Sequence, residues 1–155
     1  MKNITHGLVK LETILTSGLM VGVVIFVFVA AVMRWVGAPL SWSVEFAQLL
    51  FVWVIFLGAN KALREGKHIG VDFITSRLPE KISNLIAIVM NILMISFLAF
   101  VGYHGILLSI ENSVRLINNL PFSYSFVTIA VPVGAALMII TLLINTSKLI
   151  KKQFA

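Results

Sequence analysis

Residues that could carry chemistry are scarce in this chain, and most lie at the ends of its apolar stretches. Residues 45–72 show the contrast, because an apolar first half long enough to cross a bilayer is followed by a short polar turn. The ionisable residues of this inner turn are Lys61, Arg64, Glu65, Lys67, His68 and Asp72. Proteins that move ions or protons across membranes usually hold ionisable groups at mid-depth. None occurs between Glu12 and Arg34 or between Glu45 and Lys61, so the predicted interior is uncharged.

Metal, haem and catalytic sites are not indicated either. The chain has no Cys, which excludes disulfides, thiolate metal sites and cysteine catalysis. His6 lies in the N-terminal tail, His68 lies at the inner end of the second apolar run, and the third run starts at Ile82 on the same side. His104 is 22 residues beyond that start, roughly 33 Å across the bilayer, so it cannot share an ion with His68. We expect no metal, no cofactor and no enzymatic activity.

The composition is that of an integral membrane protein. Hydrophobic residues make up 59% of the chain and charged residues 12%, with a mean hydropathy of +1.04, whereas soluble domains carry roughly 25% charged residues. The formal charge of +6 gathers at the ends of apolar runs, which favours orientation signals and lipid contacts over nucleic-acid binding. Its 155 residues predict a single membrane domain, residues 1–155.

Four apolar runs reach the roughly 18–20 residues that a spanning helix needs. Because no water is present at membrane depth, each run must satisfy its own backbone and is predicted to be a helix. The sequence therefore predicts an all-α polytopic protein. Its four transmembrane helices are expected over residues 13–36, 44–63, 82–110 and 122–146.

Two local features modify this plan. Val71, Ile74 and Leu78 recur at helical spacing, which predicts a short interfacial amphipathic helix over residues 70–78 between the second and third spans. An irregular loop is the alternative there. In the fourth span, Pro132 is expected to bend the helix because it removes a backbone donor.

The distribution of Lys and Arg sets the orientation. If the N-terminus is cytoplasmic, ten of these residues lie inside and only Arg34 and Arg115 lie outside. This is a strong positive-inside bias, so both termini are expected on the cytoplasmic side. Trp35 and Trp42 would then lie at the outer interface, where indole rings are enriched.

Small and polar residues within the spans predict contacts between helices. Asn91 could form a hydrogen bond to another helix, and Glu45 could complement a helix dipole or contact a partner protein. Small residues that permit close packing occur in every span. They are Gly18, Gly22, Gly58, Ala59, Gly102, Gly105, Gly134, Ala135 and Ala136. Four helices would not use all of this surface internally, which favours a larger helical partner.

The central stretch also resembles a known family. It contains Glu45-xx-Gln48, then Trp53, then Phe56-Leu57-Gly58-Ala59, then Arg64-Glu65-Gly66-Lys67-His68-Ile69-Gly70-Val71-Asp72. This series resembles the small membrane subunit of tripartite ATP-independent periplasmic (TRAP) transporters, and the four-helix layout agrees over the whole chain. One departure is that members often have two adjacent acidic residues where this chain has Val44-Glu45.

The resemblance implies a place in a three-part, sodium-coupled transporter of the bacterial inner membrane. A soluble periplasmic binding protein would capture an organic acid, a C4-dicarboxylate or a sialic acid, and a large permease subunit, expected as a separate chain, would carry it with sodium. The small subunit would brace the scaffold of the large one, in contact with lipids and without nucleic acid. Which organic acid is carried does not follow from the sequence.

Two sets of contact residues follow as hypotheses. The inner set, expected to meet the large subunit, is Arg64, Lys67, His68, Asp72, Trp53 and Gly58; local capping and headgroup binding are the alternative. The outer set, expected to help dock the binding protein, is Arg34, Trp42, Ser43, Glu45 and Arg115. Rival functions are a generic four-helix assembly subunit and a small multidrug exporter. The exporter would need a membrane-buried carboxylate, which the first span lacks.

Overall fold

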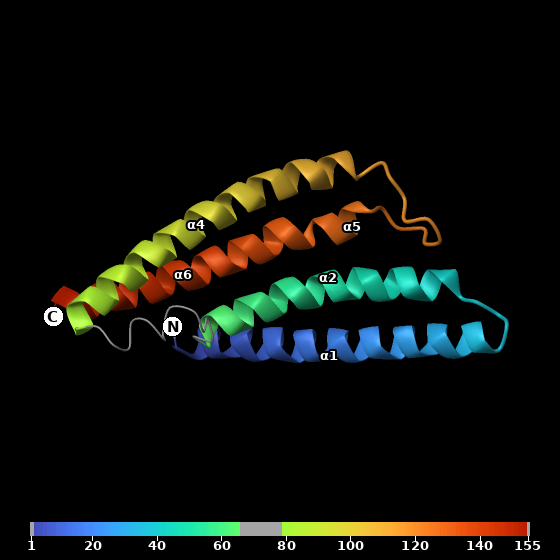
Figure 1. Ribbon diagram of the computed structural model, residues 1–155, viewed down its shortest axis with the longest axis horizontal. Helices are drawn as coiled ribbons and strands as arrows, with labels where there is room; N and C mark the ends of the chain where they lie inside the picture. The colour runs from blue at the N-terminus through green and yellow to red at the C-terminus, as the bar shows by residue number, and fades with distance from the viewer. Residues whose placement is uncertain (1, 66–78, 155) are drawn as a thin grey trace.

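Four long helices make up most of this computed structural model, which describes residues 2–65 and 79–154. They are α1 (Lys2–Trp35), α2 (Ser41–Arg64), α4 (Glu80–Glu111) and α6 (Ala130–Phe154), with the one-turn helix α5 (Ser125–Thr128) directly before α6 (Figure 1). An isolated antiparallel bridge joins Leu116 to Ser123, and the described ranges contain no strand. The predicted all-α fold is confirmed. The predicted interfacial helix over residues 70–78 lies outside the described residues.

Each long helix is long and apolar enough to cross a membrane. The candidate spans are Val9–Trp35, Ser41–Arg64, Ile82–Glu111 and Ser125–Ile150. Only 6% of the most apolar window of the first and third spans is buried inside the chain, against 39% in the fourth. Large apolar side chains therefore cover the outer surfaces of α1 and α4, as expected for helices that face lipid or a partner.

The turn between α1 and α2 is closed by Gly37. Its φ of +86° lies in the left-handed region, which glycine adopts without steric cost. The amide of Gly37 donates to the carbonyl of Arg34, and the amide of Ala38 donates to that of Met33. This is the Schellman pattern that ends many helices. Helix α2 begins at Ser41, three residues ahead of the predicted start.

The fourth span runs through α5 and α6 without a change of course in its backbone. Ile129, between the two helices, keeps helical dihedral angles (φ −66°, ψ −19°), and its amide donates to the carbonyl of Ser125. Pro132 follows in the first turn of α6. The bend expected at Pro132 stays a prediction.

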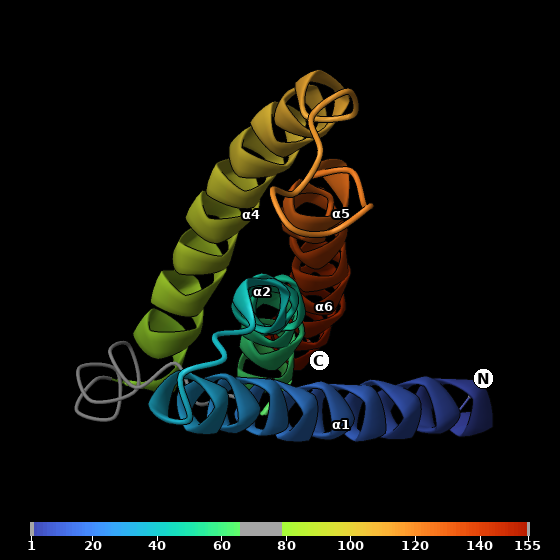
Figure 2. The same cartoon turned by 90° about the vertical axis from the view of Figure 1, so that its right-hand side faces the viewer.

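The helices lie in an open row and not in a closed bundle. Helix α1 packs on α2, α2 packs on α6, and α6 packs on α4 (Figure 1). Among the helices described, α1 meets neither α4 nor α6. Figure 2 shows α1 crossing α2 obliquely, with α6 and α4 on the other side of α2. Both termini lie toward one end, as four spans require (Figure 1).

Small residues set the spacing within this row. A Cβ added at Gly134 would lie 2.5 Å from Phe56 Cβ, so α6 approaches α2 closely there. One at Gly105 would lie 3.0 Å from Pro132 Cδ, where α4 meets α6. The most buried apolar residues include three from α6, namely Ala130, Ala135 and Leu142. Helices α2 and α6 thus form the centre, and α1 and α4 flank it.

Candidate functional site

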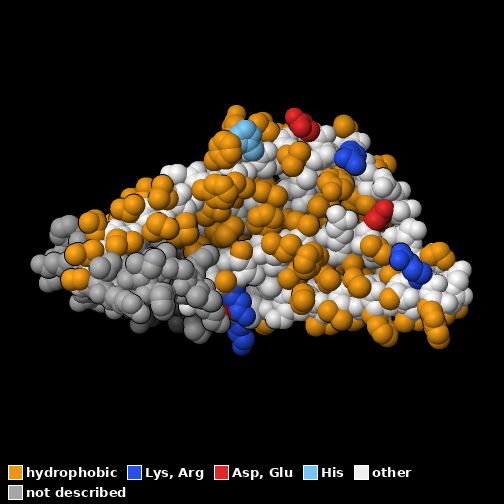
Figure 3. Space-filling model, viewed as in Figure 1, with side chains coloured by type: hydrophobic (Ala, Val, Ile, Leu, Met, Phe, Trp, Pro, Cys, Tyr) orange, Lys and Arg blue, Asp and Glu red, His pale blue; other side chains and the backbone are white. Residues whose placement is uncertain are grey.

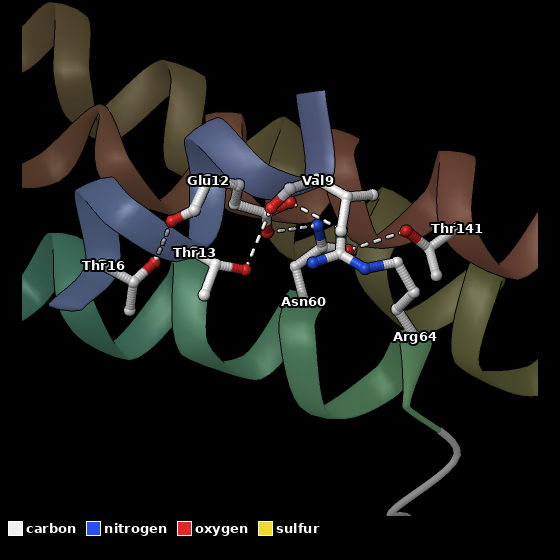
Figure 4. A network of polar contacts seen from close by, with 7 residues as sticks. All are labelled: Val9, Glu12, Thr13, Thr16, Asn60, Arg64 and Thr141. Atoms are coloured by element: carbon white, nitrogen blue, oxygen red, sulfur yellow. Dashed lines mark hydrogen bonds and ion pairs between the residues drawn. The ribbon is translucent and has the colours of Figure 1, made fainter. Parts of the chain in front are cut away.

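A polar network joins three helices near the end of the spans at which both termini lie, the end predicted to be the inner one (Figure 4). Arg64 Nη1 lies 2.6 Å from Glu12 Oε2, and Asn60 Nδ2 donates to Glu12 Oε1 at 2.8 Å. The hydroxyl of Thr141 donates to Asn60 Oδ1 at 2.8 Å. The network therefore runs from α1 through α2 to α6, and we refer to Glu12, Asn60, Arg64 and Thr141 as the inner network.

The inner network is sheltered and its polar atoms are occupied. Asn60 is 3% exposed, and the side chains of Glu12 and Arg64 are 14% and 25% exposed. Both carboxylate oxygens of Glu12 and both polar atoms of Asn60 are bonded. Thr16 uses its hydroxyl locally, donating to the carbonyl of Glu12 at 2.8 Å. These bonds tie α1, α2 and α6 to one another.

The sequence patterns did not predict this network. They assign Arg64 to the large-subunit interface, with local capping and headgroup binding as the alternative, and give Asn60 and Thr141 no role. A signal was present, because Glu12 and Arg64 stand at nearly equal distances along the chain from the Gly37 turn. In a helical hairpin such residues lie at the same depth, and opposite charges there can pair.

A second cluster orders the loop at the other end of the molecule. The backbone amide of Asn119 donates to Glu45 Oε2 at 2.7 Å, and its side-chain amide donates to Oε1 at 2.7 Å. Within the same loop, the guanidinium of Arg115 lies 5.0 Å from the ring centre of Tyr124. Ile117, which is 7% exposed, anchors the loop from inside. Residues 112–124 are therefore fixed to α2 through Glu45.

This contact and the start of α2 exclude the helix-dipole role considered for Glu45, whereas its contact with a partner protein stays a prediction. Because α2 begins at Ser41, Glu45 lies beyond the first turn, and that turn contains no acidic residue. A dipole role needs a carboxylate within the first turn, since the effect falls off after it. Glu45 instead binds Asn119 of its own chain.

The proposed outer docking residues do not all reach the surface. Ser43 is fully buried, and its hydroxyl donates to the carbonyl of Phe26 at 2.8 Å, so its inclusion in that set is corrected. It joins α2 to α1 and offers no surface to a partner. Arg34 and Arg115 are exposed, and Trp42 is 42% exposed beside the ring of Phe26. For these exposed residues, docking remains a prediction.

The residues proposed to contact the large subunit differ in how the structure places them. Arg64 is engaged with Glu12, and the indole of Trp53 donates to the carbonyl of Phe126 at 3.1 Å, which ties α2 to α5. Gly58 has open space where a Cβ would stand. The other three residues of that set, Lys67, His68 and Asp72, lie outside the described residues. The interface with the large subunit therefore stays a prediction.

The middle of the spans carries neutral ties only. Asn91 Nδ2 donates to Thr146 Oγ1 at 3.0 Å, which confirms the predicted hydrogen bond from Asn91 to another helix. No group of three or more His, Cys, Asp and Glu side chains comes together in the part of the chain that the structure describes. In Figure 3 charged side chains gather at the end with the α4–α5 loop, and apolar side chains dominate between the ends.

Comparison with known proteins agrees with this architecture. Residues 23–152 match the family described as tripartite ATP-independent periplasmic transporters, DctQ component. The chain is 34% identical over 109 residues to the sialic acid TRAP transporter permease protein SiaT of Haemophilus influenzae, covering 65% of this chain but 16% of that protein. It is 25% identical over 131 residues to the sialic acid TRAP transporter small permease protein SiaQ of Vibrio cholerae, covering 84% of this chain and 76% of that one.

A putative TRAP transporter small permease protein of Haemophilus influenzae is 31% identical over 80 residues, about half of each chain. The family match covers most of the chain and includes α2, the α4–α5 loop and nearly all of α6. The resemblance inferred from the central stretch is therefore confirmed. This multi-pass membrane protein belongs to the DctQ-component family of tripartite ATP-independent periplasmic transporters.

Proposed function

We propose that this chain is the small permease subunit of a sodium-coupled TRAP transporter for sialic acids, and that it braces the scaffold of the large permease subunit. The relatives named as sialic acid transporter proteins support the substrate class. The SiaT relative supports the partner, because the segment matched is only 16% of a much longer permease. The chain would lie in the bacterial inner membrane with both termini in the cytoplasm, as its Lys and Arg distribution favours.

The way in which polar groups are used within the spans carries this proposal. A carrier of an anionic sugar and of sodium needs unpaired polar or charged groups that face a common space. In the described spans, Glu12 and Arg64 pair with each other, and the amides of Asn60 and Asn91 each bond to a neighbouring helix. This use of the polar groups supports a bracing role for this chain, with cargo and ions bound by the large subunit.

The open row of helices supports the bracing role. A part of a transporter that moves through the bilayer needs a counterpart that stays fixed in it. Helices α1 and α4 expose broad apolar surfaces, and each packs on one side only. Such a layer increases the area anchored in lipid, because apolar side chains gain free energy in the hydrocarbon core in proportion to their area.

The outer loop supports a second part of the proposal, help in docking the periplasmic binding protein. The bonds between Glu45 and Asn119 hold residues 112–124 in one conformation. Arg34 and Arg115 are exposed at this end. A preformed loop binds with a smaller loss of conformational entropy than a flexible one.

Reconstitution of transport tests the proposal. The large subunit is placed in proteoliposomes with or without this chain, at matched amounts, and the binding protein and labelled N-acetylneuraminate are supplied outside. With this chain present, an inward sodium gradient should drive uptake that is lost without the gradient. Full uptake in the absence of this chain would refute the brace, and uptake of succinate in preference to N-acetylneuraminate would refute the substrate class.

A further inference from the structure

Helix α2 has three faces, and only two of them are covered. Toward α1, Leu50 lies against Gly22 and Phe46 packs against the ring of Phe26. Toward α6 and α5, α2 presents Phe56, Asn60 and Trp53. The third face holds every exposed residue of α2 between Ser43 and Arg64. These residues are Val44, Gln48, Phe51 and Ile55.

The spacing of this third face suits another helix. The residues follow at steps of four, three and four, the pattern of a helix that packs on a neighbour at a small crossing angle. The same steps continue to Gly58 and Ala62, which are small. Apart from the backbone of α2 itself, no atom of the described residues lies within 4 Å of the Cβ position of Gly58, so its side of α2 can receive another backbone closely.

Gln48 distinguishes this face from a surface that simply meets lipid. It is exposed, roughly 9 Å below Trp42 along the helix, and it makes no hydrogen bond with any residue the structure describes. Hydrocarbon offers an amide no partner, and an unmatched amide is costly there. The amides of Asn60 and Asn91 are each bonded to a neighbouring helix. The exposed amide of Gln48, which has no bonded neighbour among the described helices, therefore indicates that a helix of another chain packs there.

The exposed surface of α4 differs in this respect. Between Ile82 and Phe100 its exposed side chains are apolar apart from the hydroxyl of Ser96, and the exposed Tyr103 and His104 lie nearer the α4–α5 loop. A serine hydroxyl can bond to a carbonyl of its own helix, whereas an amide with two donors and two acceptor sites cannot be satisfied in this way. Residues 82–100 of α4 therefore present a surface suited to contact with lipid.

We infer that the stripe Val44, Gln48, Phe51, Ile55 and Gly58 receives a transmembrane helix of the large permease subunit, with a polar group of that helix bonded to Gln48. The inference rests on the proposed function and adds the face and the contact to it. The SiaT relative is the reason for this occupant, because there the matching segment is part of a longer permease that supplies further chain beside it. The partner helix would place a hydroxyl, amide or carbonyl about 9 Å, nearly two helical turns, below the outer interface.

Cross-linking tests the face. The chain has no Cys, so single cysteines introduced at Phe51, Ile55 and Gly58 can be labelled with a photoactivated maleimide, against matched cysteines at Leu93 and Phe97 on α4. Each variant is co-expressed with an affinity-tagged large subunit and irradiated in native membranes. The stripe positions should yield the cross-linked heterodimer and the α4 positions should yield at least fivefold less.

The outcomes separate the inference from the proposed function. Cross-links that arise at α4, with none at the stripe, would overturn the inference and leave the small-subunit role intact. Failure of the unmodified chain to co-purify with the large subunit would overturn both.

Substitution of Gln48 tests the polar contact. Gln48→Leu should weaken recovery of the heterodimer by about three- to tenfold, the range for one hydrogen bond between membrane helices. The matched change Ser96→Leu on α4 should leave recovery unchanged. Stability of Gln48→Leu alone should not fall, because no partner within the described chain is lost. Unchanged recovery of Gln48→Leu would mean that the amide meets water or headgroups, and would refute the contact.

Discussion

The inner network gives the sharpest quantitative prediction for this fold. Removing the carboxylate with Glu12→Ala takes away the one charge partner that Arg64 has among the described residues, and a hydrogen bond to Asn60. Breaking a buried ion pair by deleting one partner costs about 3–5 kcal/mol. This pair retains some exposure, 14% for Glu12 and 25% for Arg64, so the expected loss is about 2–3 kcal/mol. Glu12→Gln keeps an acceptor for Asn60 and should lose about 1–2 kcal/mol.

The assay is equilibrium unfolding of the purified chain by SDS titration in mixed micelles. It reports the free energy of separating helices that remain helical. Glu111→Gln is the matched control, because Glu111 is exposed at the outer end of α4. Its effect should stay below about 0.5 kcal/mol. A double-mutant cycle with Arg64→Met should give a coupling energy of about 1–2 kcal/mol. A cost for Glu12→Ala equal to that of the control, or no coupling, would refute the reasoning.

Three further predictions concern other contacts between helices. Gly134→Val would place a Cβ 2.5 Å from that of Phe56, so α2 and α6 must separate, at a cost of about 1–3 kcal/mol in the same titration. Glu45→Gln weakens a charge-assisted bond to the backbone amide of Asn119, and hydrogen exchange at that amide should become about tenfold faster. Asn91→Leu removes the bond to α6 and should cost about 0.6–2 kcal/mol in SDS titration.

Each of these predictions has a matched control. Gly18→Val, on the open side of α1, meets nothing within 4 Å and should change the unfolding free energy by less than about 0.5 kcal/mol. Glu111→Gln should leave exchange at Asn119 unchanged. Ser96→Leu, which replaces an exposed hydroxyl on α4, is the reference for Asn91→Leu. Equal effects in a variant and its control would show that the contact in question contributes nothing specific.

Much of the architecture could be predicted because it depends on local properties of the chain. Whether a segment crosses a bilayer is decided by the summed transfer free energy of about 20 adjacent residues, so the four spans are legible in the sequence. The family could also be identified from the sequence, because the motif from Glu45 to the inner turn is contiguous.

The pairing of polar residues was less accessible. Glu45 and Asn119 are 74 positions apart, and Asn60 and Thr141 are 81 apart. Such pairs depend on the relative rotation, depth and crossing of two helices, and many combinations are compatible with the same hydropathy. Ser43 illustrates the consequence, because a serine beside an exposed Trp42 reads as a surface residue until the position of α1 is known.

The amino-acid sequence by itself determined that the chain is α-helical, which segments enter the membrane and which transporter family it belongs to, because each depends on residues close together in the chain. The tertiary structure alone decided that the helices form an open row, that Glu12 neutralises Arg64, and that one face of α2 is left with an unmatched amide. Those features depend on how surfaces of distant segments fit together, and that fit is a property of packing geometry, which no local pattern encodes.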